Sequence, residues 1–179
     1  MDRHLEIPYE RHDRVRRLID AIRYCLESIS LSFDGWNEPR IRGPGTYFAI
    51  VAGRSITDFA DPMGDNRWPV DGSREVLADL DAFYEAAQPV ALENDGAVVV
   101  SVDGVVQEQM VRFRDHPHEG DGYADWMGTR HMSALDTSLR DPVVATLTLS
   151  QETGRVTVFR DGEYDSIEHD DLASRWREG

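Results

Sequence analysis

Two short apolar runs, residues 46–52 and 97–102, restrict the fold of this chain more than any other feature. Both are rich in small, β-branched or aromatic residues and are too short for a buried helix, so each predicts a buried β-strand. Asp103-Gly104 follows the second run as a typical hairpin turn, and residues 105–113 are expected to return as the paired strand. Two further strands are predicted, over 143–149 and 155–159.

Helical patterns separate these strands. Apolar residues recur at three- and four-residue spacing within 8–31, which predicts an amphipathic helix packed on the sheet; they are Val15, Leu18, Ile19, Ile22, Leu26 and Ile29. Further helices are expected over 74–88 (capped by Ser73 and closed by Pro89), over 130–140 and in the tail from Glu168, with 60–72 as loop. Strands interspersed with helices predict an α/β fold: one domain with a mixed central sheet flanked by helices.

The charge balance excludes several functions. The chain has 34 acidic and 19 basic residues, a net charge of -15, and every basic residue is arginine. Without lysine, neither a Walker-type phosphate loop nor Schiff-base chemistry is possible. An acidic chain without a basic stripe predicts no nucleic-acid partner and no membrane partner. We favour adaptation to a salt-rich cell interior over GC-rich codon usage as the source of this pattern, because salt screens self-repulsion.

The location is expected to be cytoplasmic. No apolar run approaches the roughly 18 residues that a transmembrane helix needs. The first 17 residues carry charges where a signal peptide has its apolar stretch. The single cysteine, Cys25, excludes an internal disulfide and fits a reducing compartment.

Three short motifs lie at predicted strand or helix ends. Asn94-Asp95-Gly96-Ala97 puts a carboxylate beside small residues at the start of a strand, although Asp-Gly is also an ordinary turn. Gly128-Thr129-Arg130-His131 opens a helix with Thr129 as the expected N-cap. Positively charged residues in the first turn interact unfavourably with the helix dipole unless an anion such as phosphate binds there. The alternative is that Arg130 is an ordinary surface residue and that His131 has hydrogen-bond partners within the protein. Ser150-Gln151-Glu152-Thr153-Gly154 is either a simple hairpin or a turn that offers a hydroxyl and a carboxylate to a ligand.

In this order and spacing, the three motifs resemble the DAC domain of diadenylate cyclases, over about residues 43–165. That family shows a DGA motif, a GTRHR motif at a helix start, and a turn of serine, an acidic residue, glutamate, threonine and glycine. The chain departs from the family pattern at Asn94, where a histidine is usual, and at Met132, which replaces the second arginine of RHR. The resemblance implies three segments: an N-terminal helix and linker (1–42), a catalytic domain (43–165) and a tail (166–179).

The resemblance also implies an activity, the condensation of two ATP molecules into cyclic di-AMP with a divalent cofactor, Mn²⁺ or Mg²⁺. Asp95 would hold the metal and help to activate the ribose 3′-hydroxyl, with Glu152 as a second metal-associated carboxylate. The residues implied to line the nucleoside or bind the phosphates are Gly96, Ala97, Gly128, Thr129, Arg130, His131 and Ser150. Two such domains would meet face to face, so a homo-oligomer is implied.

Two other functions are kept open. A degenerate DAC fold could bind ATP or cyclic di-AMP as a sensor without turnover, and Met132 supports that reading. A metal-dependent hydrolase is the more distant alternative, because Asp115-His116-Pro117-His118-Glu119 places two histidines near carboxylates. No third nitrogen or sulfur ligand is obvious nearby, so we favour a solvated loop there.

Overall fold

The computed structural model describes residues 12–38, 40–52, 60–62, 75–93, 96–113 and 123–178. The helices are α1 (Asp13–Ser32), α2 (Leu80–Glu93), α3 (Thr129–Ser138) and α4 (His169–Glu178). The strands are β1 (Thr46–Val51), β2 (Ala60–Pro62), β3 (Ala97–Ser101), β4 (Val106–Phe113), β5 (Val143–Leu149), β6 (Val156–Arg160) and β7 (Glu163–Ile167). Within the described ranges, no helix combines the length and the hydrophobicity needed to cross a membrane.

The strands form one seven-stranded mixed sheet in the order β2-β4-β3-β1-β5-β6-β7. Only β1 and β3 pair in parallel, and the other five pairings are antiparallel. The β3–β4 hairpin turns at Asp103-Gly104, where Gly104 has φ 89° and the Ser101 N–H donates to the Val105 carbonyl over 2.9 Å. The α/β fold with a mixed sheet flanked by helices is therefore confirmed.

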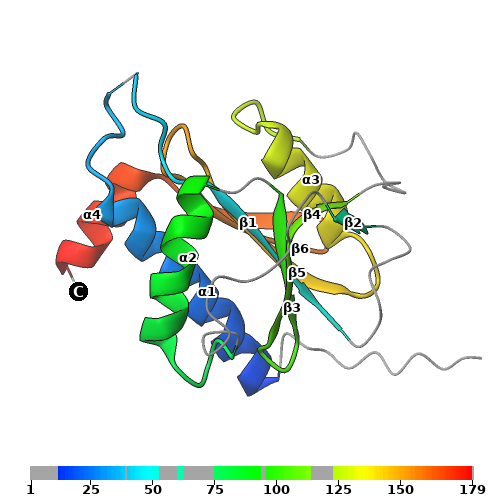
Figure 1. The fold of residues 1–179 in the computed structure, drawn as a ribbon. Helices are drawn as coiled ribbons and strands as arrows, with labels where there is room; N and C mark the ends of the chain where they lie inside the picture. The colour runs from blue at the N-terminus through cyan, green and yellow to red at the C-terminus, as the bar shows by residue number, and fades with distance from the viewer. Residues whose placement is uncertain are drawn as a thin grey trace, which may run out of the picture.

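Helices cover both faces of this sheet (Figure 1). Helices α1, α2 and α4 lie on one side, which we call the α1 face, and α3 lies on the other, the α3 face. Side chains along β1 point alternately to the two faces. Phe48 and Ile50 belong to the core on the α1 face, whereas Tyr47 and Ala49 belong to the core on the α3 face. A strand buried on both faces reads as a continuous apolar run, which is how β1 reads in the sequence.

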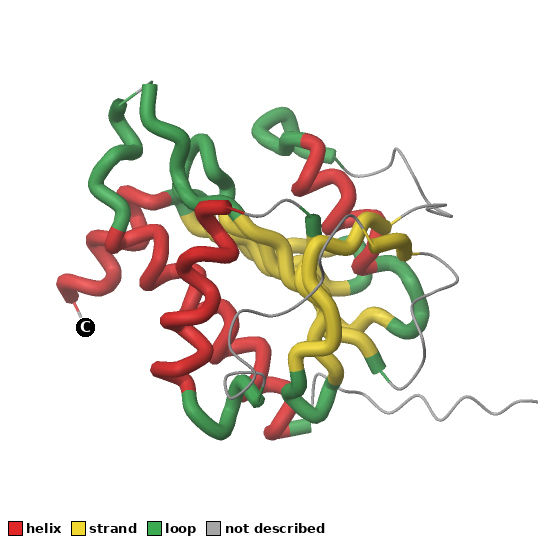
Figure 2. The backbone as a smooth tube through the Cα atoms, viewed as in Figure 1, coloured by secondary structure: helices red, strands yellow, loops and turns green. Residues whose placement is uncertain are grey.

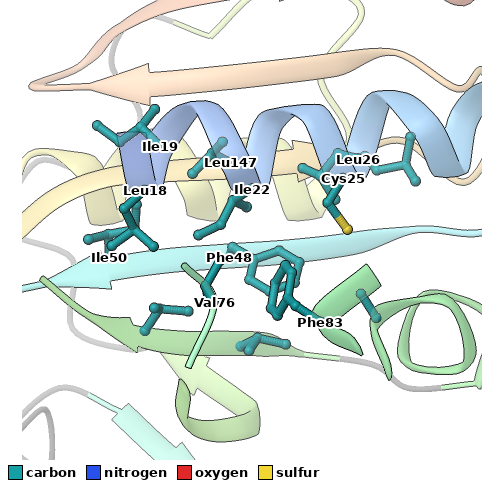
Figure 3. Packing of buried hydrophobic residues seen from close by; sticks show 14 of the residues in the cluster. Leu18, Ile19, Ile22, Cys25, Leu26, Phe48, Ile50, Val76, Phe83 and Leu147 are labelled. Carbon is teal, nitrogen blue, oxygen red and sulfur yellow. The ribbon is translucent and has the colours of Figure 1, made fainter. Parts of the chain in front are cut away.

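The larger core lies between α1, α2 and the sheet (Figure 3). Leu18, Ile22 and Leu26 of α1 are fully buried against the sheet. From α2, the Phe83 ring meets Phe48 edge to face, with 5.9 Å between the ring centroids. Such a contact adds to the apolar area that both rings bury. The stripe predicted for the first helix thus packs on the sheet, and its basic residues lie mostly off that stripe.

Helix α2 differs from its prediction at both ends. It begins at Leu80 rather than 74, because the preceding residues are held to the β3–β4 hairpin: Glu75 bridges Val105, and the Val76 N–H donates to the Gly104 carbonyl over 2.8 Å. The actual cap is Asp79, whose Oδ1 accepts the Ala82 N–H over 3.0 Å. At the other end, the prediction that Pro89 closes the helix is wrong.

Pro89 lies inside α2, which continues to Glu93. A proline interrupts one helical hydrogen bond, at a cost of about 3 kcal/mol. Burial on both sides of it offsets that loss, because Ala86, Ala87, Val90 and Ala91 all pack into the core of the α1 face. A residue such as proline shows where a helix is least stable, but packing against the rest of the protein determines where the helix ends.

Two strands escaped the sequence analysis. Strand β2 lies within the predicted loop 60–72 and pairs with β4. Strand β7 follows β6 through a tight turn, but as an edge strand it is mostly exposed and lacks apolar alternation. The remaining predicted elements are present, and their ends differ by at most two residues except in the first helix, which was predicted from residue 8 and begins at Asp13 with His12 as its N-cap. The expected Ser73 cap and the 115–119 loop lie outside the described residues.

Candidate functional site

The three motifs converge on one edge of the sheet. Because β1 and β3 are parallel, their N-terminal ends share an edge, and the antiparallel β5 ends where they begin. The strand register confirms this shared edge, since Thr46, the first residue of β1, pairs with Leu149, the last residue of β5. Helix α3 also begins at this edge, which lies at the upper side of Figure 2 together with the β5–β6 turn and the 33–45 loop. Residues 96–97, 128–131 and 150–154 thus lie at the same edge of the sheet, although they are far apart in the sequence.

The start of α3 has no negative charge of its own. Its N-cap is Gly128 in an extended conformation, without a side-chain cap, so the prediction that Thr129 is the N-cap is wrong: Thr129 is the first helical residue. No acidic residue lies in the first turn, where the helix dipole favours negative charge. The amides that begin a helix have no partner within it, so here they are left to a ligand or to solvent.

His131 has an unusual environment in this turn. Its side chain is 6% exposed, and the ring meets Trp126 edge to face at 5.2 Å between centroids. Nδ1 accepts the Gly128 N–H over 3.4 Å, which makes Nε2 the protonated nitrogen of the neutral ring. Nε2 is buried and has no hydrogen-bond partner among the described residues. A buried donor without a partner is costly, so its presence beside a helix N-terminus points to a ligand or an ordered water.

Burial lowers the pKa of His131 to about 4, with smaller contributions from the positive charges of Arg130 and Arg155. The ring is therefore neutral at neutral pH and offers a hydrogen-bond donor rather than a charge. An anion bound in contact with it would raise that pKa, because the ion stabilises the protonated form.

Arg130 reaches from α3 across to the segment before β1. A Cβ added to Gly45 would lie 2.5 Å from Arg130 Nη1 and 2.6 Å from Gln151 Cβ, so the guanidinium rests against bare main chain. Gly45 is buried and donates its N–H to the Ala91 carbonyl over 2.8 Å, which fixes it to the end of α2. No motif in the sequence marks Gly45, because its contact with Arg130 forms between distant segments.

The β5–β6 turn brings Ser150 and Glu152 to the same edge. Ser150 Oγ accepts the N–H groups of Glu152 and Thr153 over 3.3 and 3.4 Å, so it shapes the turn and keeps its O–H as a donor. The Glu152 side chain is exposed. Gly154 has φ 74°, in the region that favours glycine, and its N–H returns to the Ser150 carbonyl.

The structure describes only part of the predicted metal site. Asp95 lies outside the described residues, so its pairing with Glu152 stays a prediction. Gly96 and Ala97 are described: Gly96 has φ 86°, and Ala97 is fully buried on the α3 face at this edge. Across the described part of the chain, no three His, Cys, Asp or Glu residues group as metal ligands would. An exposed carboxylate such as that of Glu152 is the kind of oxygen ligand that Mg²⁺ and Mn²⁺ prefer.

Fold and site together define a mixed α/β domain in which a helix begins, without acidic residues in its first turn, at the edge where the two parallel strands begin. Residues 75–164 match the family model DAC, described as "DisA bacterial checkpoint controller nucleotide-binding". The chain belongs to this family, which confirms the resemblance seen in the motifs. None of the curated proteins compared with the sequence matches it.

Two solved structures have the same fold. One is a hypothetical membrane spanning protein from Bacillus cereus, with a TM-score of 0.56 and 14% identity over 86% of this chain. The chain spans 63% of that structure's length. The other is a double mutant of DacA from Staphylococcus aureus, with a TM-score of 0.54, 17% identity, and coverage of 91% of this chain and 95% of that one. At such identities the likeness establishes the fold.

Proposed function

We propose that this domain is a diadenylate cyclase, which joins two ATP molecules into cyclic di-AMP and releases two pyrophosphates. One observation carries the proposal: the N-terminus of α3, with Arg130 and the buried donor of His131, lies at the same sheet edge as the Gly96-Ala97 segment that begins β3. This is a place where phosphates and a nucleoside can bind side by side. Family membership supports the same reading.

The reaction needs positioning and charge neutralisation more than covalent catalysis. The 3′-oxygen of one ATP attacks the α-phosphorus of the other, the bond to pyrophosphate breaks, and a second such step closes the ring. Arg130 and the α3 amides would stabilise the negative charge on the phosphate, while neutral His131 donates one hydrogen bond. Asp95 and Glu152 would hold Mn²⁺ or Mg²⁺, which supplies further neutralisation and favours ionisation of the attacking hydroxyl.

Each ATP must present its 3′-oxygen to the α-phosphorus of the other. Two copies of the domain with facing sites supply that geometry, so we propose a homo-oligomer working in the cytoplasm, where ATP is available. The net charge of -15 without lysine supports a salt-rich cytoplasm. If assembly is required, specific activity will rise with protein concentration, and activity that stays constant down to monomer concentrations would rule it out.

The direct test is an assay of purified protein with ATP and Mn²⁺ or Mg²⁺ in molar KCl, with cyclic di-AMP and pyrophosphate as the readout. We expect Asp95→Asn to abolish product while ATP still binds, because the variant removes a metal ligand. The matched control is Asp161→Asn, which removes the same charge from the β6–β7 turn at the opposite edge; Asp161 has φ 50°, which asparagine tolerates well. If Asp95→Asn keeps more than a few per cent of the control's activity, Asp95 does not hold the metal.

A sensor that binds nucleotide without turnover is the second candidate. It is favoured by Met132, which is half-buried and packs against the core of the α3 face where the family has an arginine. We expect Met132→Arg to change activity less than about fivefold in molar salt, because the Debye length is then about 3 Å and an added guanidinium contributes little. The comparison is wild type against the variant at several KCl concentrations. A silent wild type beside an active variant would make the natural protein a binding module.

A further inference from the structure

Trp126 lies between the start of α3 and the hairpin formed by β6 and β7. Its half-buried indole meets the His131 ring edge to face at 5.2 Å between centroids, and it meets the Tyr164 ring of β7 in the same way at 5.6 Å. The guanidinium carbon of Arg155 lies over the indole, 4.2 Å from its centroid. A cation at this distance is attracted by the ring, more strongly where water is excluded. The β6–β7 hairpin thus holds Trp126 while its indole packs against His131.

Arg155 is itself fixed by contacts with β7 and the residue that follows it. Its Nη1 donates to Ser166 Oγ over 3.2 Å, and its Nη2 donates to Glu168 Oε1 over 2.6 Å. The strand register brings these groups together, because Val156 of β6 pairs with Ile167 of β7 directly beside them. A guanidinium is planar and rigid, so two directed contacts determine its orientation. Arg155 therefore presents a fixed surface to the indole.

The charges around His131 favour the neutral ring. Burial is the main cause that lowers its pKa to about 4, and the positive charges of Arg130 on α3 and Arg155 on β6 act in the same direction. The carboxylates on the neighbouring segments, Asp125 and Glu168, are exposed, so solvent and salt screen them. The indole that packs on the imidazole contributes to its burial. The cluster thus keeps the ring neutral and able to donate one hydrogen bond.

The hydrogen bond that His131 makes within its own turn does not fix the ring. Nδ1 accepts the Gly128 N–H over 3.4 Å, which is longer than a well-formed hydrogen bond. Nε2 has no partner among the described residues. The orientation of the imidazole therefore depends on the aromatic contact with Trp126, and a donor must be held in place before it can act in a reaction.

We propose that Trp126 and Arg155 are positioning residues for the reaction: Arg155 holds the indole against His131, and the indole fixes the orientation of the imidazole. The inference rests on the proposed function, in which the neutral His131 ring donates a hydrogen bond to the substrate. Trp126 and Arg155 act through His131 and have no need to touch the substrate themselves.

The first test follows the charge of His131 by NMR of its ring in the full chain without ligand. Spectra are taken from about pH 8 to about pH 5.5, where a group with a pKa of about 4 stays neutral and one near 6.5 changes its charge. The His131 signals are identified by their absence in His131→Gln. The variants are Trp126→Ala, Trp126→Phe and Arg155→Met. The matched control is Arg160→Met, which removes a positive charge from an exposed position at the other end of β6.

We expect the His131 signals of the wild type and of Arg160→Met to stay constant over this range. In Trp126→Ala they should titrate, because the ring loses the indole that buries it, and in Arg155→Met they should move in the same direction by less. Trp126→Phe keeps an aromatic contact and should behave like the wild type. If Trp126→Ala does not fold, Arg155→Met decides the matter. Signals as constant in the folded variants as in the wild type would overturn the proposal.

The second test asks whether the effect on the reaction passes through His131. Trp126→Ala and Arg155→Met should each lower kcat/KM for cyclic di-AMP formation by about two- to tenfold, because one neutral hydrogen bond contributes about that much. In a His131→Gln background, the same substitutions should change kcat/KM by less than about twofold, because the group on which they act is gone. Equal losses in both backgrounds would show that the two residues act independently of His131, and the proposal would then be wrong.

Failure of this inference and failure of the cyclase assignment are distinguishable. If no cyclic di-AMP forms but His131 titrates in Trp126→Ala, the positioning of His131 by its neighbours stands and the enzyme assignment falls. If cyclic di-AMP forms and the ring stays neutral in every variant, the enzyme assignment stands and the two residues have no positioning role.

Discussion

The two faces of the sheet are filled by different chemistry. On the α1 face, three helices bury a continuous apolar layer in which Leu18, Ile22, Leu26 and Phe83 are at most 1% exposed. On the α3 face, one short helix covers a smaller apolar cluster that is mixed with buried polar groups. Four of those groups have a buried polar atom without a hydrogen-bond partner among the described residues: His131, Asp136, Thr137 and Thr148.

This difference separates stability from function. Apolar packing without polar groups gives the most stable and most specific core, whereas buried donors and acceptors without partners destabilise a fold unless something else satisfies them. The α3 face keeps such groups directly beneath the helix that carries Arg130 and His131. We therefore infer that the α1 face provides the rigid support and that the α3 face gives up stability at the site where the proposed function needs a ligand.

The largest expected effect comes from breaking the apolar layer. Leu26→Ala should lower the free energy of unfolding by about 2–5 kcal/mol, because Leu26 is fully buried and its neighbours cannot close the cavity. The same substitution at Leu92, which is 55% exposed on α2, should cost less than about 1 kcal/mol. Denaturant unfolding measures both. The activity of each folded Leu26→Ala molecule should match that of the wild type. A loss of activity in the folded variant would contradict the inference that the α1 face provides support and not function.

The next effect concerns the pH dependence of the α3 face. The pKa of His131 is about 4 in the folded protein and near 6.5 when unfolded, so between these values only the unfolded chain takes up this proton. Stability should therefore fall as pH drops from about 6.5 to about 4, by roughly 3 kcal/mol from this residue. His131→Gln removes that contribution, while the carboxylates titrate equally in both proteins. Parallel stability curves for wild type and variant would show that His131 is not buried as described.

The smallest effect distinguishes two buried hydroxyls on β5. Thr146 Oγ1 donates to the Ala134 carbonyl over 2.7 Å, so Thr146→Val should cost about 1 kcal/mol, or roughly 2–4 °C in melting temperature. Thr148 Oγ1 is buried without a partner among the described residues, so Thr148→Val should be neutral or stabilising. Thermal melts compare the pair directly. A loss at Thr148 equal to that at Thr146 would mean that an ordered water or another group satisfies the Thr148 hydroxyl.

Much of the fold follows from short-range patterns. The runs 46–52, 97–102 and 143–149 are strands because apolar, β-branched residues buried on both faces leave no other placement. The boundaries of α2 do not follow from such patterns, because Glu75 pairs with a hairpin thirty residues later and Pro89 is overruled by the packing around it. The edge strand β7 has no apolar alternation, because three of its five residues are exposed, and its side-chain contacts with β6, such as Thr157 with Ser166 and Phe159 with Tyr164, form only on folding.

The candidate site likewise contains some residues that the sequence indicates and others that it does not. The residues with distinctive chemistry, Arg130, His131 and Ser150, could be identified from motif order, and the structure brings their segments to one edge. Gly45, Trp36 and Arg42 could not be identified, because their contacts with α3 or with the β5–β6 turn form only on folding. A glycine in a turn and an arginine in a loop are common in any sequence. Their contacts form only because segments far apart in the sequence approach each other.

The same long-range closure governs how the chain acquires its structure. Ser30 in α1 donates to the Gly154 carbonyl over 2.7 Å, across 124 residues of sequence, and α1 packs on β5, β6 and α4. At about 5–20 residues per second, a ribosome takes roughly 6 to 25 seconds to make the partners that α1 lacks. During that interval the apolar stripe of α1 has no sheet to cover it and is a surface for chaperones or for aggregation. We therefore expect this domain to fold late and cooperatively rather than sequentially from its first helix.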